Sequence, residues 1–286
     1  MLFRFIDLIL YGHFWIALAA WMMQAQSQFL YFGEYRWTAL DGFITAGTLV
    51  IYAIHRLVAM RLQQAPVYAG RFKVMSAYQS HIVAYALMAA VVGGWFFFQL
   101  RFRMQLLLLV PCLVALGYVL PVFRGRRLRD FPYLKIFLIA FSWAWLTVVG
   151  PVLQWGETWN SALLWMFIER AAFIFAITIP FDIRDLELDQ EKEVATLPGR
   201  LGIQRAKKVA YAALGLMLFA VTWNTIYGHY SLGVALGLLL SAVLSGLLIY
   251  GADAKRHDYY YTGLLDGTMI LQAVLVGLAI CFFSFG

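Results

Sequence analysis

Residues 161–190 read SALLWMFIERAAFIFAITIPFDIRDLELDQ, a mostly apolar run that ends in closely spaced aspartates. A helix of roughly 20 apolar residues is what crossing a hydrocarbon core of about 30 Å requires. Only helices and closed barrels satisfy their own backbone hydrogen bonds in lipid. The stretch therefore predicts a membrane-spanning helix that brings its aspartates to the membrane surface.

The whole composition agrees with a membrane protein. Of the 286 residues, 63% are hydrophobic and 13% are charged, whereas a soluble domain is about half apolar and about a quarter charged. We expect an all-α, polytopic membrane protein, with nine transmembrane helices forming one helical domain over residues 1–286. The expected spans lie near residues 6–27, 38–60, 78–99, 104–122, 133–153, 160–180, 206–227, 230–250 and 262–284. Cys112 and Cys281 fall inside these spans, so neither a disulfide framework nor a thiolate metal cluster is indicated.

The basic residues predict an orientation. With nine spans, 18 of the 22 Lys and Arg residues fall on the side of the N-terminus, and the positive-inside rule makes that side cytoplasmic. We expect a multi-pass protein of a bacterial inner membrane, with the N-terminus and the motif loops in the cytoplasm. These charges either orient the chain and contact anionic lipid or also attract a polyanionic substrate. Nucleic-acid binding is disfavoured, because the basic residues are spread over membrane loops without a recognition motif.

Three aspartates after the sixth span suggest a metal site. Asp182, Asp185 and Asp189 are spaced i, i+3, i+7, which places them within an arc of about 60° on one helix face. We expect Pro180 to end the span just before them, at the mouth of the membrane. Three neighbouring carboxylates repel one another, and Mg²⁺ binds such carboxylates together with water and substrate phosphates. The alternative is a solvated acidic loop whose charges pair weakly with nearby cations.

A family resemblance makes this interpretation more specific. FDIRDLELDQEKEVATLPGRLG, residues 181–202, resembles the second Asp-rich region of the UbiA prenyltransferase family, which has nine helices and cytoplasmic motif loops. The resemblance implies transfer of an isoprenyl group from a prenyl diphosphate to a lipophilic acceptor, expected to be aromatic. It implies that Asp182, Asp185 and Asp189 are catalytic and bind Mg²⁺. Tyr118 and Lys135 are carried over as diphosphate-binding residues, and Lys192, beside the motif, is a further candidate.

The second expected span departs from the family pattern. Residues 48–61 read TLVIYAIHRLVAMR, without one Asp or Glu, where the family carries its first Asp-rich motif. His55 and Arg56 could contact diphosphate directly, because arginine offers a planar fork of donors and a protonated histidine can donate. Alternatively, both residues end a helix at the interface, where cations favour the C-terminal dipole.

Other polar residues in the expected spans have two interpretations. Glu169 and Arg170 lie in the middle of the sixth span, where charged residues face either a cavity or a partner on another helix. Asp266 at the head of the ninth span has the same status. His81 is a weaker candidate, more typical of a hydrogen-bonded core histidine.

Several functions therefore stay open beside the prenyltransferase. A noncatalytic UbiA-like lipid-binding or scaffold protein would explain the missing first motif, and a membrane terpene cyclase would use the same ionisation. A transporter would show paired broken helices in two repeated halves, and no clear internal repeat is present. The partners expected are the prenyl diphosphate, the acceptor and membrane lipid, and no protein partner is inferred.

Overall fold

The protein consists of helices and the loops that connect them, without a strand, in the part of the chain that the computed structural model describes, residues 2–62, 78–121, 125–191 and 194–283. The long helices are α2 (Phe14–Phe32), α3 (Ala39–Leu62), α5 (Gln79–Gln99), α6 (Phe102–Val119), α9 (Ser161–Arg184), α12 (Ile203–Ile226), α13 (Leu232–Gly251) and α14 (Asp266–Phe283). A further long helical segment consists of α7 (Leu134–Ala144), the π-helical turn η2 (Trp145–Val149) and α8 (Gly150–Gln154). The shorter elements are α1 (Leu2–Tyr11), η1 (Leu128–Asp130), α10 (Leu186–Glu191), α11 (Leu197–Leu201) and η3 (Tyr260–Leu265).

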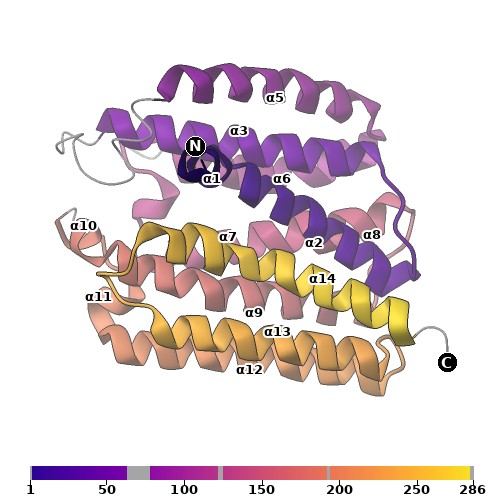
Figure 1. The fold of residues 1–286 in the computed structure, drawn as a ribbon. Coiled ribbons are helices and arrows are strands. Elements are labelled where there is room, and N and C mark those ends of the chain that lie inside the picture. Colours follow the sequence, from indigo (N-terminus) through magenta and orange to yellow (C-terminus); the bar gives the residue numbers. More distant parts are fainter. Residues whose placement is uncertain (1, 63–77, 122–124, 192–193, 284–286) are drawn as a thin grey trace.

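The long helices lie side by side, with their axes running roughly in one direction (Figure 1). α5 forms one side of the bundle, α12 and α13 form the opposite side, and α10 and α11 lie together at one end. In the most apolar 18-residue stretch of α9, 67% of the residues are buried, compared with 17% in the corresponding stretch of α5. α9 is therefore a central helix, and most of the α5 surface faces outward.

Seven helical segments of the described chain are long and apolar enough to cross a membrane. The protein is thus an integral, multi-pass membrane protein, and the expectation of nine spans is supported for seven. α2 and α3 are of spanning length but fall outside this set. For α2 the difference is explained by polar residues, since this helix contains Gln24, Gln26 and Gln28, all of them buried inside the bundle.

The end of α9 differs from the prediction. Proline has no backbone N–H and crowds the carbonyl four residues earlier, so we expected the helix to end at Pro180. Instead α9 continues through Pro180 to Arg184, and Asp185 follows in a turn. Such prolines are tolerated where neighbouring helices and local polar groups support the backbone, and Pro180 is buried within the bundle. Asp182 therefore lies within the helix rather than after it.

The two charged residues in the middle of α9 are part of the bundle core. Arg170 is fully buried and donates hydrogen bonds to the Met23 carbonyl at 3.1 Å and to Thr147 Oγ1 at 3.0 Å. Glu169 is also fully buried, and its Oε2 accepts a hydrogen bond from the Tyr230 hydroxyl at 2.8 Å. Of the two interpretations of this pair, the structure supports contacts between helices.

Candidate functional site

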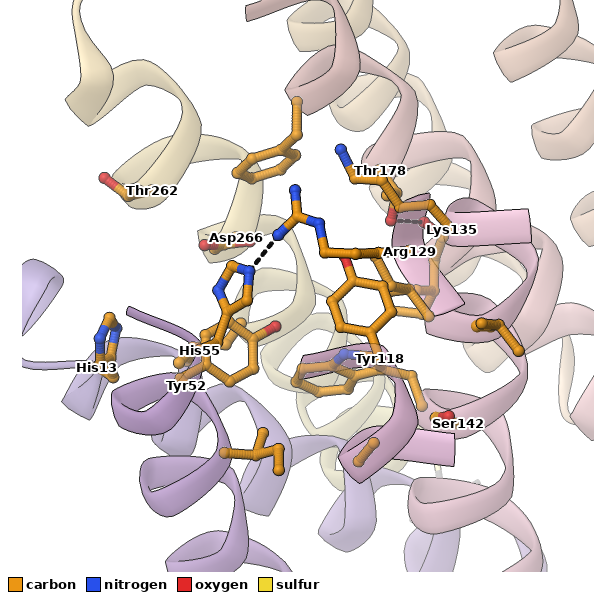
Figure 2. Close-up of a pocket in the computed structure, with 18 of the residues that line it drawn as sticks. His13, Tyr52, His55, Tyr118, Arg129, Lys135, Ser142, Thr178, Thr262 and Asp266 are labelled. Atoms are coloured by element: carbon orange, nitrogen blue, oxygen red, sulfur yellow. Dashed lines mark hydrogen bonds between the residues drawn. The ribbon is translucent and has the colours of Figure 1, made fainter. Parts of the chain in front are cut away.

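A cavity of about 250 Å³ opens between the helices near one end of the bundle. α2, α3, α6, α7, α9 and α14 contribute its walls, and Figure 2 shows part of its lining. Its polar lining residues are His13, Tyr52, His55, Arg56, Tyr118, Arg129, Lys135, Ser142, Thr178, Arg184, Asp185, Thr262 and Asp266. Its apolar lining includes Trp15, Ile51, Leu138, Trp143, Ile174 and Met269.

The cavity is charged at one end and apolar further inside. Lys135 lies at the start of α7, whereas Trp143 lies eight residues along the same helix, about 12 Å deeper at 1.5 Å per residue. Arg184 and Ile174 have the same relation at the end of α9. Such a cavity suits a ligand with an anionic head and an apolar tail.

The cavity wall next to α9 contains the Asp-rich segment. The Lys135 ammonium lies 2.6 Å from Asp182 Oδ1 and 3.9 Å from Asp189 Oδ2. Asp185 lines the cavity itself and receives two hydrogen bonds from the Arg184 guanidinium, at 2.9 and 3.0 Å. Asp182 and Asp189 thus share one cation, whereas Asp185 pairs with another and does not join them as the helical spacing predicted.

The three aspartates differ in how well they could bind Mg²⁺. The described residues contain no group of three His, Cys, Asp or Glu side chains arranged for a metal ion. Mg²⁺, however, needs only one or two carboxylates when substrate phosphates and water complete its shell. Asp189 Oδ2 is buried without a hydrogen bond, so it is an oxygen available to a cation. Asp182 and Asp189 therefore fit one ion that shares them with the Lys135 ammonium or displaces it, and Asp185 would first have to leave Arg184.

The electrostatics of Asp189 agree with this fit. Burial raises the pKa of the Asp189 carboxyl, and the neighbouring Lys135 ammonium only partly opposes that shift. A carboxylate that is costly to ionise in place gains from an added cation.

On the neighbouring wall, His55, Arg129 and Tyr118 contact one another. An Arg129 guanidinium nitrogen contacts His55 Nε2, and the dashed line in Figure 2 marks this contact. The guanidinium carbon lies 5.4 Å from the centre of the Tyr118 ring, and the His55 and Tyr118 rings are 6.0 Å apart. Because a guanidinium carries donors only, His55 Nε2 must accept. That nitrogen is therefore engaged with Arg129 and does not donate to a ligand in this arrangement.

The structure brings most of the predicted site residues to one place. His55, Arg56, Tyr118, Lys135 and Asp185 all line the cavity. Asp182 and Asp189 are absent from the lining but contact Lys135, which belongs to it. The predicted diphosphate-binding residue Lys192 lies outside the described residues.

Sequence reasoning missed Arg129 and Arg184 as parts of the cavity wall. Both had been counted as charges that orient the chain or pair at the surface. The i, i+3 spacing of Arg127 and Asp130 was a signal in the sequence for a turn at this place. In the structure the two side chains form an ion pair at 2.8 Å. This pair closes the turn of η1 and so fixes the two residues between them, Leu128 and Arg129.

Comparison with known proteins identifies the family. The model of the UbiA prenyltransferase family matches residues 57–264. The chain belongs to this family. The match begins just after His55 and Arg56, so only the last five residues of the 48–61 segment that lacks the first Asp-rich motif fall within it.

Solved UbiA structures share the fold at low identity. A UbiA homologue from Archaeoglobus fulgidus bound to GPP and Mg²⁺ is 12% identical with a TM-score of 0.63, covering 97% of this chain and 99% of that one. An apo UbiA homologue from Aeropyrum pernix K1 is 12% identical with a TM-score of 0.62, covering 95% and 97%. A structure reported for digeranylgeranylglyceryl phosphate synthase is 10% identical with a TM-score of 0.56, covering 98% and 97%. No curated protein sequence matches.

Proposed function

We propose that this UbiA protein is an intramembrane prenyltransferase that transfers an isoprenyl group from a prenyl diphosphate to a lipophilic, aromatic acceptor. The observation that carries the proposal is the cavity with a cationic end and an apolar interior. A homologous structure is described as bound to GPP and Mg²⁺, and GPP has this combination of anionic head and apolar tail. We place the protein in a bacterial inner membrane, with the charged end of the cavity cytoplasmic.

In this proposal the diphosphate lies at the charged end. Lys135 and Arg56, which line that end, attract its negative charge, and Tyr118 can donate a hydrogen bond to a phosphate oxygen. Asp182 and Asp189 would hold Mg²⁺, which neutralises the charge that develops on a departing diphosphate. Lys192 is retained as a further diphosphate-binding candidate.

The isoprenyl chain then occupies the apolar interior. The bond between the allylic carbon and the diphosphate oxygen breaks, and the electron pair leaves with the diphosphate. An electron pair of the acceptor forms the new bond to the allylic carbon, and the acceptor loses a proton. Trp15, Tyr52 and Trp143 line the cavity, and their ring faces stabilise a cation.

A noncatalytic, lipid-binding relative is the second candidate. The observation in its favour is that Asp182 and Asp185 are already neutralised by Lys135 and Arg184 without any metal ion. Such a protein would bind a prenyl diphosphate or another anionic lipid and leave it intact. A terpene cyclase would release diphosphate without consuming an acceptor.

One assay separates these functions. The purified protein in detergent is given radiolabelled prenyl diphosphates, from dimethylallyl to geranylgeranyl, with aromatic acceptors and with or without Mg²⁺. The proposal predicts Mg²⁺-dependent diphosphate release with a labelled, acceptor-containing product. Asp182→Asn should lower the rate on the order of 100-fold, as loss of one contact to developing charge does. Glu187→Gln is the matched control, because Glu187 is exposed on the same segment.

The other outcomes of this assay distinguish the alternative functions. Release without acceptor consumption indicates cyclisation or hydrolysis. Binding without release supports the noncatalytic relative. Release that neither Mg²⁺ removal nor Asp182→Asn alters would contradict the proposed mechanism.

A further inference from the structure

One part of the cavity wall carries cations and no carboxylate. Among the described lining residues from α3, α6 and η1, the polar ones are Tyr52, His55, Arg56, Tyr118 and Arg129. The UbiA family carries its first Asp-rich motif at the position in the sequence where α3 has His55 and Arg56. A wall without carboxylates cannot hold a metal ion through carboxylate oxygens. Whatever this wall contributes to anion binding must come from its own donors.

Arg129 is a cation of this wall that its neighbours hold in place. His55 accepts from one guanidinium nitrogen, and the Tyr118 ring lies under the guanidinium at 5.4 Å. The backbone on either side is fixed by Arg127, whose side chain and amide both bond to Asp130. Figure 2 shows the Arg129 side chain between His55 and Lys135. Its position is therefore set before any ligand enters.

Arg129 also differs from the other cations in its partners. Lys135 pairs with Asp182 at 2.6 Å, and Arg184 pairs with Asp185 and Asp258 at 2.9 Å. The described residues place no carboxylate within ion-pair distance of Arg129. Arg129 is half-buried and feels its neighbouring aspartates only from beyond ion-pair distance, so an entering anion can form the direct ion pair that this guanidinium lacks.

The charge of Arg129 persists in this setting. Burial would lower the pKa of its guanidinium, but the attraction of Tyr118 and of the aspartates Asp189 and Asp185 raises it overall. Arginine has five donors in a rigid fork that fits two phosphate oxygens. With one nitrogen directed to His55, further donors remain for a ligand.

We propose that Arg129, positioned by His55 and Tyr118, binds phosphate oxygens of the prenyl diphosphate directly and replaces the metal contact of the absent first Asp-rich motif. This inference rests on the proposed function for the identity of the ligand. Its consequence is that part of the diphosphate affinity is independent of divalent metal. His55 acts through Arg129, as a hydrogen-bond acceptor that orients the guanidinium.

The test measures binding of inorganic pyrophosphate to the full-length protein in detergent with excess EDTA, by calorimetry. Wild type is expected to bind without metal. Arg129→Ala should weaken this binding roughly 10- to 100-fold, the usual effect of losing a charged hydrogen-bond donor. Arg126→Ala is the matched control, because Arg126 is an exposed arginine of the same loop and its loss changes the net charge equally. That variant should bind like wild type.

Two further variants separate positioning from folding. Arg129→Lys keeps the charge but loses the fork, so its metal-free affinity should fall between those of wild type and Arg129→Ala. His55→Phe keeps a ring against Tyr118 but cannot accept from Arg129, and it should bind more weakly. His55→Gln provides an accepting amide oxygen and should recover much of the affinity. Unfolding temperatures without ligand identify any variant that is merely misfolded.

The inference and the proposed function fail in different ways. Wild type that binds pyrophosphate only with Mg²⁺, or Arg129→Ala that binds like Arg126→Ala, overturns the inference and leaves prenyl transfer untouched. Arg129-dependent, metal-free binding without turnover of any prenyl diphosphate keeps the anion site and contradicts the proposed function.

Discussion

Lys135 is the residue on which the charged end of the cavity depends. Its ammonium is 10% exposed and lies between two carboxylates, of which Asp182 is 1% exposed. Removing the cation from a buried pair leaves an uncompensated charge, which costs more than the pair itself contributes. Here two carboxylates would be left facing each other.

Lys135→Met should therefore destabilise the protein by roughly 3 kcal/mol. Mg²⁺ should recover part of the loss, because the ion can take the place of the ammonium between Asp182 and Asp189. Thermal unfolding in detergent, with a Mg²⁺ titration, measures both effects. Lys208→Met is the control, since Lys208 is exposed and should respond to neither. A Lys135→Met protein that Mg²⁺ does not stabilise would show that these two aspartates are not a metal site.

The residues of the site were predictable to different degrees. The aspartates were suggested by their spacing and Tyr118 and Lys135 by the family resemblance, and the structure brings them to one region. Arg129 was not predicted, because it lies on a loop between α6 and α7 where no periodicity says which side chain points inward. The pairing of Asp185 with Arg184 also escaped prediction, since helical spacing gives a direction from the axis and not the partner that a side chain finds.

At the scale of elements, one arginine joins three parts of the bundle. Arg170 on α9 bonds to the Met23 carbonyl on α2 and to Thr147 in η2. The residue is absent from the cavity lining. Its role is therefore to hold α9, which carries Asp182, against its neighbours.

Arg170→Met should lower stability by about 3 kcal/mol, because buried acceptors and the adjacent Glu169 lose a charged partner. The rate per folded molecule should stay within about two-fold of wild type, because no ligand contact is removed. Thermal unfolding and the prenyl-transfer assay, corrected for the folded fraction, measure the two effects. A large loss of rate at unchanged stability would instead place Arg170 in the site.

α9 and α2 show how packing between helices affects features that the sequence alone does not predict. Pro180 predicted a helix end, and α9 runs four residues further. The intrinsic cost of proline was correctly identified, but the packing that offsets it lies on other helices. The glutamines of α2 show the same influence of packing, since they are buried inside the bundle and do not face lipid.

At the scale of the molecule, composition was sufficient for the all-helical membrane class. The orientation remains a prediction from the basic residues. Arg126 lies in the connection between α6 and η1, and Glu157 lies in the connection between α8 and α9, so one membrane-spanning segment separates them.

Single cysteines at these two positions should report opposite sides of the membrane. In a background with Cys112→Ser and Cys281→Ser, we expect Arg126→Cys to react with a membrane-impermeant thiol reagent only in inside-out vesicles. Glu157→Cys should react only in right-side-out vesicles. The reverse pattern would invert the orientation, and labelling of both from one side would contradict the span between them.

We expect a prenyl diphosphate to bind in the cavity between α3, α6, α7 and α9. The most direct measurement is photocrosslinking with a geranyl diphosphate analogue that carries a photoreactive group on its terminal isoprene unit, followed by peptide mapping. If the ligand binds there, we expect label within Leu138–Trp143 of α7 and Ile174–Thr178 of α9, abolished by excess unlabelled geranyl diphosphate. Label confined to the outward-facing α5, or to the surface groove of α12 and α13 around Tyr211 and Tyr250, would contradict it.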